Sequence, residues 1–130
     1  TAPLIYFIEE NPAYIETVRF FFEAMDRGDF LIVTSTVTLL EVLVHPFRSN
    51  NRKLAAEYRD ILLNSKLTIL EVSTSIAEQA AQLRAAHNIR TPDAIQVSAA
   101  LSAGASHFLT NDISLPEIPS IQIFSLDALL

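Results

Sequence analysis

Three acidic residues, Glu41, Asp93 and Asp112, occupy positions at which their carboxylates can be brought together. The stretch from Thr91 to Asp112 reads TPDAIQVSAALSAGASHFLTND, which predicts a helix followed by a short buried strand. A helix of about 12 residues carries the chain about 18 Å one way, and the strand brings most of it back. Asp93 and Asp112 should therefore lie at the same edge of a sheet. Two such carboxylates repel each other unless a positive charge lies between them, and a divalent metal ion is the usual one.

The ends of this predicted helix carry ordinary boundary signals. Thr91 is a good N-cap residue, and Pro92 suits the first helical position. Gly104 is expected to end the helix, because glycine readily adopts the left-handed conformation found at helix C-termini. Asp93 then falls in the first turn, where an acid is also stabilised by the helix dipole alone. That simpler explanation of Asp93 stays open.

Glu41 belongs to a second predicted strand and helix. The strand Phe30–Thr34 is fully apolar, as in buried parallel sheets, and a helix follows it to about Val44, ending near Pro46. The Glu41 side chain should lean back toward the start of that helix, and so toward the carboxyl edge of the sheet. An unpaired carboxylate among aliphatic neighbours would be costly. Alternatively, Glu41 belongs to an ordinary polar stripe with residues at helical spacing, namely Thr34, Thr38 and His45.

Strands and helices alternate along the whole chain, which predicts one α/β domain over residues 1–130 with a mostly parallel central sheet flanked by helices. Ligands bind such sheets outside the carboxyl ends of the strands. Further helices are expected over residues 13–27, 51–64 and 75–87, the last beginning at a capping box of Ser75 and Glu78. Further strands are expected over residues 67–72 and 121–124.

Composition limits the function further. The net charge of −6 argues against a broad basic face for nucleic acid, although clustered metal-binding acids would add to the negative count. The chain has no cysteine, which excludes disulfides and thiolate zinc sites. Carboxylates without histidine or cysteine suit Mg²⁺ or Mn²⁺. We find no signal peptide and no membrane span, so a cytoplasmic location is expected.

The combination of TLLEVL, TPDAIQ and LTND resembles the PIN-domain ribonucleases, and among them the VapC-like toxins of toxin–antitoxin systems. The resemblance extends over essentially all of the chain. It implies a metal-dependent endoribonuclease that uses Mg²⁺ or Mn²⁺, forms a homodimer and is blocked by an antitoxin protein. The acids of the family motifs fall on Glu41, Asp93 and Asp112, which the resemblance makes both metal ligands and catalytic residues.

A wider set of residues is expected to contact the RNA substrate, and it consists of Thr1, Ser35, Thr110, Asn111, Arg48 and Arg52. Thr110 and Asn111 complete the TND motif and should orient Asp112 or a metal-bound water. The two arginines would hold phosphates, although a solvated helix start explains them equally well. Ser35 also suits a helix cap, as do Thr36 and Thr38.

The family pattern contains one more acid, an Asp at the end of an opening strand, which would directly precede Thr1. We therefore expect a truncated chain whose sheet has a gap at the first strand and whose metal site lacks one ligand. This difference favours an alternative function, a non-catalytic PIN-like interaction module. A carboxylate phosphotransferase is a further alternative, but Asp112 has no partner lysine within reach in the sequence.

Overall fold

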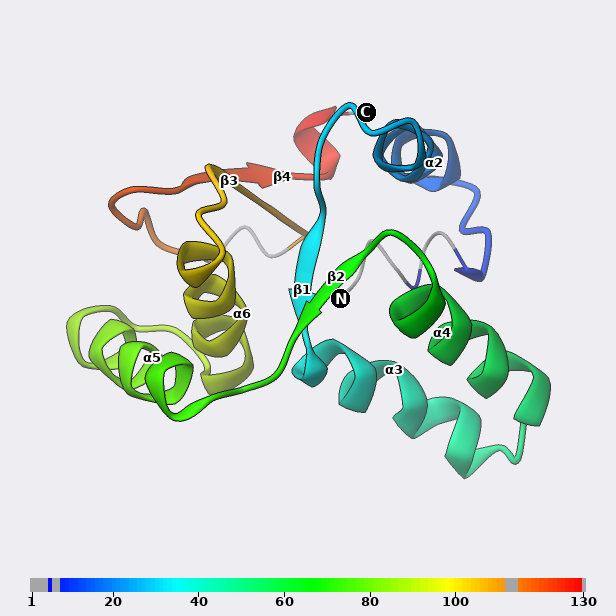
Figure 1. The fold of residues 1–130 in the computed structure, drawn as a ribbon, viewed down its shortest axis with the longest axis horizontal. Coiled ribbons are helices and arrows are strands. Elements are labelled where there is room, and N and C mark those ends of the chain that lie inside the picture. The colour runs from blue at the N-terminus through cyan, green and yellow to red at the C-terminus, as the bar shows by residue number, and fades with distance from the viewer. Residues whose placement is uncertain (1–4, 6–7, 112–114, 130) are drawn as a thin grey trace.

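The computed structural model describes Ile5, residues 8–111 and residues 115–129, with short strands between the helices (Figure 1). The α-helices with defined bounds are α2 (Ile15–Asp26), α3 (Thr36–Arg48), α4 (Arg52–Asn64), α5 (Thr74–Ala86) and α6 (Thr91–Ser102). The strands are β1 (Val33–Ser35), β2 (Thr68–Leu70), β3 (His107–Thr110) and β4 (Gln122–Ser125), and a 3₁₀ helix, η1 (Asp127–Leu129), follows the last of them. Within these residues, no helix has both the length and the apolar character needed to cross a membrane.

The four strands of the described residues pair in parallel, in two separate pairs. Strand β1 pairs with β2, with Val33 opposite Thr68, and β3 pairs with β4, with His107 opposite Gln122. The predicted α/β class with parallel strands is confirmed. The described part of the chain contributes no strand that joins the two pairs into one sheet.

The helices lie on two sides of the β1–β2 pair. In Figure 1, β1 and β2 run through the middle of the molecule, with α5 and α6 on one side and α3 and α4 on the other. Helix α6 begins at the end of the molecule where β1 passes into α3. The helix that carries Glu41 and the helix that carries Asp93 therefore start at the same edge.

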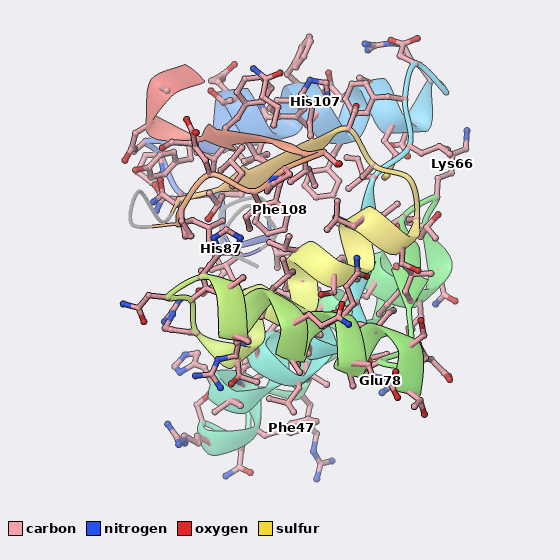
Figure 2. All side chains as sticks on the ribbon, turned by 90° about the vertical axis from the view of Figure 1, so that its left-hand side faces the viewer. Phe47, Lys66, Glu78, His87, His107 and Phe108 are labelled. Carbon is pink, nitrogen blue, oxygen red and sulfur yellow. The ribbon has the colours of Figure 1, made fainter. Side chains whose placement is uncertain are left out.

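Three hydrophobic clusters hold these helices in place, one of which packs Ala80 of α5 against Ala94 of α6. The other two hold α3 and α6. The first of these two includes Val42 and Leu43 of α3, packed against residues of α2, α4 and the turn before β2, namely Phe22, Met25, Ala55, Tyr58, Leu62 and Leu67. The second packs Val97 and Ala100 of α6 against Ile118 and Ile121, with Phe108 of β3 at its margin. Figure 2 shows His107 and Phe108 on opposite sides of β3, as the alternation of a strand requires. His107 stacks on Phe124 with a ring separation of 5.2 Å.

The helix boundaries agree with the sequence signals in part. Gly104 has φ of +75° and follows α6, as predicted. The predicted end of α3 near Pro46 was wrong, because the helix continues through this buried proline to Arg48. The proline removes only one hydrogen bond in the last turn, and Ser49 caps the carbonyl of His45 through its amide and its hydroxyl. The capping box at Ser75 was also wrong, since Ser73 caps α5 by accepting from the Ile76 amide.

The buried hydroxyl group of Tyr58 should make the protein less stable at alkaline pH. Its ring is only 1 % exposed, and its hydroxyl donates to the Glu9 carboxylate at 2.5 Å. Burial, followed by this hydrogen bond and the charges of Glu9 and Glu57, raises the pKa of Tyr58 well above its ordinary value of 10.0. Above pH 10 the unfolded chain releases the phenol proton while the folded chain retains it. The free energy of unfolding should therefore fall as the pH rises beyond 10.

Urea unfolding between pH 8 and 11 measures this effect. The Tyr58→Phe variant should start about 1 kcal/mol less stable at pH 8 and then decline less steeply than the parent. Parallel declines in the two proteins would show that other groups cause the alkaline loss.

Candidate active site

Glu41 lies in the second turn of α3, on the same face of the helix as Thr38, which precedes it by three residues. Its side chain is exposed, so its carboxylate is not enclosed by the aliphatic residues around it. Thr38, one turn earlier, is only 2 % exposed and its hydroxyl lies 2.7 Å from that of Thr34. The polar stripe foreseen from the sequence therefore runs from a buried start at β1 to an exposed carboxylate at Glu41.

Asp93 lies in the first turn of α6, with 23 % of its side chain exposed. Its carboxylate accepts a hydrogen bond from Nε of Arg90 at 2.9 Å, and the two form an ion pair. Arg90, and not the predicted Thr91, is the N-cap residue of α6, and its side chain makes no capping hydrogen bond. From the sequence we expected a metal ion to neutralise Asp93. In the structure, Arg90 supplies part of that positive charge.

A direct contact between α3 and α6 brings the two acids into one region. Nε2 of Gln96 donates to the hydroxyl of Thr38 at 2.6 Å. Asp93 precedes Gln96 by three residues on α6, and Glu41 follows Thr38 by three residues on α3. Residues three apart on a helix have Cβ atoms roughly 5–6 Å apart, so each acid lies one helical turn from the same contact.

The other predicted residues are distributed as follows. Thr110 ends β3 and Asn111 follows it, and both are partly buried. Asp112 and Thr1 lie outside the described residues. Ser35 is 0 % exposed, accepts from the Val37 amide as the N-cap of α3, and donates to Oε1 of Gln96 at 2.8 Å. The predicted capping role of Ser35 is confirmed, and its hydroxyl is not accessible to a substrate in this conformation.

A basic cluster surrounds the turn between α3 and α4. It consists of four exposed side chains, Arg48, Arg52, Lys53 and Arg59. Arg48 follows Glu41 by two helical turns, which is about 10 Å along the axis of α3. The ion pairs found among the described residues involve other arginines, Arg19, Arg27 and Arg90. Arg48 is the arginine of α3, so the cluster begins on the helix that carries Glu41, in a chain with net charge −6.

The described acids suit a hard cation by their chemistry. Glu41 and Asp93 offer carboxylate oxygens, and Mg²⁺ commonly binds through one or two carboxylates while keeping several waters. Among the described residues no group of three or more His, Cys, Asp or Glu side chains is placed to hold a metal ion. A third ligand would have to come from the solvent or from a residue such as Asp112, which lies outside the described ranges.

Two residues of this region were given no role from the sequence. The ion pair of Arg90 with Asp93 has the spacing of three that helical pairs favour, so the sequence contained a signal for it. Gln96 is the last residue of TPDAIQ, but nothing in the sequence identified Ser35 and Thr38 as its partners. Such contacts between distant segments depend on how α6 packs against β1 and α3.

Comparisons with known proteins agree with this architecture. The family model for the PIN domain matches residues 1–120. One similar solved structure is that of VapBC2 from Rickettsia felis bound to a DNA fragment from their promoter, with TM-score 0.74, 21% identity, and 95% of this chain and 93% of that chain covered. Another is DNA-bound VapBC from Salmonella typhimurium, with TM-score 0.64, 22% identity, and coverage of 94% and 91%. No curated protein matches the sequence.

The fold, with its parallel strands and paired helices, is therefore that of a PIN-like α/β protein. The chain belongs to the PIN domain family.

Proposed function

We propose that this protein is a metal-dependent endoribonuclease and the toxin of a toxin–antitoxin pair. The observation that carries the proposal is the contact of Thr38 with Gln96, which lies one helical turn from Glu41 and one from Asp93. Membership of the PIN domain family supports a nuclease function. The similarity to chains of two VapBC structures supports the toxin–antitoxin assignment.

Glu41, Asp93 and Asp112 would hold Mg²⁺ or Mn²⁺. The chemistry supplied by the bound ion is activation of a water molecule for in-line attack on a phosphodiester, with stabilisation of the leaving oxygen. The Arg90 guanidinium lies against Asp93 and offsets part of its charge. Thr110 and Asn111, at the end of β3, would orient Asp112 or the attacking water.

The basic cluster would position the RNA. Arg48 ends α3 and Arg52 begins α4, and both side chains are exposed. Contacts to phosphates fix the register of a nucleic acid without reading its sequence. A strand held by these arginines would pass Glu41, while the rest of this acidic protein repels it. Binding should therefore weaken as salt is added.

Cleavage of RNA by the purified protein tests the function directly. We expect a labelled single-stranded RNA to be cut in the presence of Mg²⁺ or Mn²⁺, and cutting to stop when EDTA removes the ion. The corresponding DNA strand is the control for substrate class. Absence of cleavage with either ion, together with retained binding of a protein partner, would favour the non-catalytic interaction module instead.

The antitoxin partner is proposed to cover α3. Leu40, Val44 and Phe47 are 66 %, 39 % and 63 % exposed and recur at helical spacing, so they form one apolar stripe along this helix. Glu41 precedes Val44 by three residues and Arg48 follows it by four, so both flank the stripe on the helix surface. A partner that buried this stripe would also cover the acid and the nearest arginine. Inhibition and binding would then be the same event, in the cytoplasm where we place the pair.

A second apolar surface predicts the homodimer. Phe20 is 59 % exposed, its ring lies 5.6 Å from that of Phe21, and Phe21 lies 6.0 Å from Phe30. Phe22 belongs to the core, so only part of this helix is available to a second copy. The apolar sequence of residues 2–8 predicts a further part of this interface, and most of these residues lie outside the described ranges. We expect the parent protein to sediment as a dimer at micromolar concentration and the Phe20→Ser variant to shift toward monomer.

Phe47→Ser is the matched control, because Phe47 is equally exposed but lies on α3, away from this surface (Figure 2). It should leave the dimer intact. A monomeric parent, or a dimer broken by Phe47→Ser and not by Phe20→Ser, would contradict this interface.

A further inference from the structure

We infer that Gln96 is a positioning residue, which fixes the separation of α3 and α6 and thereby the separation of Glu41 and Asp93. Its side chain joins three segments of the chain. Oε1 accepts from the hydroxyl of Ser35, at the end of β1, and Nε2 donates to the hydroxyl of Thr38, in the first turn of α3. Gln96 itself lies in the second turn of α6. We call the set of Thr34, Ser35, Thr38 and Gln96 the polar clamp.

The hydroxyl groups of the polar clamp are buried, so their hydrogen bonds restrict how α6 can lie against α3. Ser35 and Thr38 are 0 % and 2 % exposed, so their hydroxyls depend on protein partners. The Ser35 hydroxyl also accepts from the Val37 amide at 3.2 Å, and Thr38 lies 2.7 Å from the hydroxyl of Thr34. Apolar contacts tolerate sliding of one helix past another, whereas hydrogen bonds of 2.6–2.8 Å do not. The amide of Gln96 therefore sets both the distance and the register of α6 against α3.

The polar clamp sets the positions of the two acids because each acid lies on a helix that the clamp holds. Asp93 and Glu41 are each three residues from a member of the clamp, within the same rigid helix. Neither acid is held by a shared hydrophobic cluster, because α3 and α6 pack into different ones. Loss of the clamp should leave each helix folded but allow their relative position to vary. The two carboxylates would then be less well arranged for one ion.

Two variants break the hydrogen bond between Gln96 and Thr38 that joins α6 to α3, one from each side. Gln96→Met keeps the length of the side chain and removes both hydrogen bonds, and Thr38→Val keeps the shape of the residue and removes the hydroxyl. Thr38→Val leaves the bond of Ser35 to Gln96 in place. The control is Val97→Ala, which removes buried volume from the neighbouring position of α6 without touching the clamp, since Val97 is 0 % exposed in the other cluster. Thr38→Val decides the question if Gln96→Met does not fold.

The first measurement needs no metal. The chain has no cysteine, so spin labels can be placed at His45→Cys on α3 and Ser102→Cys on α6, both exposed positions. Double electron–electron resonance on metal-free protein should give a narrow distance distribution for the parent and for Val97→Ala. The two clamp variants should give a broader or displaced one. A distribution unchanged by loss of the clamp, or broadened equally by Val97→Ala, would overturn the role of Gln96.

The second measurement rests on the proposed function. Binding of Mn²⁺ is measured from the decrease of the paramagnetic resonance signal of the free ion. The affinity should weaken at least about 10-fold in the clamp variants. In Val97→Ala it should weaken less than about twofold, when the variants are compared at equal loss of thermal stability. Equal weakening in all three variants would overturn the positioning role. If the parent binds no Mn²⁺, the proposed function fails, while the spin-label distances still decide whether Gln96 positions α6.

Discussion

Replacement of Asp93 by asparagine should abolish RNA cleavage while leaving the protein folded. Asp93 lies in the first turn of α6, one turn from the contact of Gln96 with Thr38. Loss of an outer-shell residue at a metal site typically costs 10- to 100-fold in affinity or activity. Loss of a ligand that also shapes the reacting site should cost more, so we expect cleavage to fall by more than about 100-fold. The assay is cleavage of labelled RNA at saturating Mg²⁺ or Mn²⁺.

The stability of Asp93→Asn separates an active-site role from a structural one. A carboxylate that serves only the helix dipole contributes about 0.3–1 kcal/mol, which its removal would forfeit without metal. A carboxylate crowded by other acids is destabilising in metal-free protein, and its removal would be neutral or stabilising. The ion pair with Arg90 adds a small opposing contribution, because Arg90 is 74% exposed and such pairs are weak. We expect the metal-free variant to melt within about 2 °C of the parent or above it.

The change in melting temperature on adding metal is the third measurement on Asp93→Asn. A ligand stabilises a protein only through its affinity for the folded state. The rise in melting temperature that Mg²⁺ or Mn²⁺ gives the parent should therefore shrink in Asp93→Asn. A variant that melts lower without metal, keeps the full metal response and still cuts RNA would exclude a catalytic role for Asp93.

Glu16 offers a control for the helix-dipole and ion-pair contributions, at a side chain that is 89% exposed where Asp93 is 23% exposed. It is the acid in the first turn of α2, and it forms an ion pair with Arg19 at a spacing of three residues. Glu16→Gln therefore removes the same interaction with the helix dipole and the same kind of exposed ion pair. It should lower the melting temperature slightly and leave cleavage and metal response unchanged. Loss of cleavage and of metal response in Asp93→Asn, but not in Glu16→Gln, would then separate a role at the metal site from a helix-dipole role.

The sequence was sufficient for features that depend on near neighbours. Alternating apolar strands and helices predicted the α/β class, and Gly104 marked the end of α6, where its φ of +75° suits glycine. Ser35 was recognised as a candidate cap because the hydroxyl and the amide that it binds are two residues apart. Signals of this kind are local, and the structure confirms them. Pro46 misled the same reasoning, since a proline in the last turn of a helix removes only one hydrogen bond.

Features that join distant segments could not be predicted. Gln96 meets Ser35 across 61 residues and Thr38 across 58, and no periodicity encodes that encounter. The separation of the strands into the pairs β1–β2 and β3–β4 depends likewise on which edges meet in space. The family motifs pointed to the acids and left open what holds their helices together. The polar clamp is thus visible only after α6 has packed against β1 and α3.

Substitutions in the core under α3 should lower the stability of the fold the most. Leu62 of α4 is 1 % exposed and packs in the cluster that contains Val42 and Leu43, the two residues that follow Glu41 in α3. Leu62→Ala removes buried volume and leaves a cavity, which should lower the free energy of unfolding by about 2–5 kcal/mol. That is a large part of the roughly 5–15 kcal/mol that holds a domain together. Urea unfolding measures the loss.

The adjacent leucine is the matched control for this variant. Leu63 has the same side chain on the same helix but is 46 % exposed, so Leu63→Ala should change the free energy of unfolding by no more than about 0.5 kcal/mol. Leu62→Ala should also reduce the metal response as α3 loosens, because Glu41 depends on this cluster for its position. Similar losses of stability in the two variants would contradict a packing role for Leu62. A Leu62→Ala protein as stable as the parent would contradict it equally.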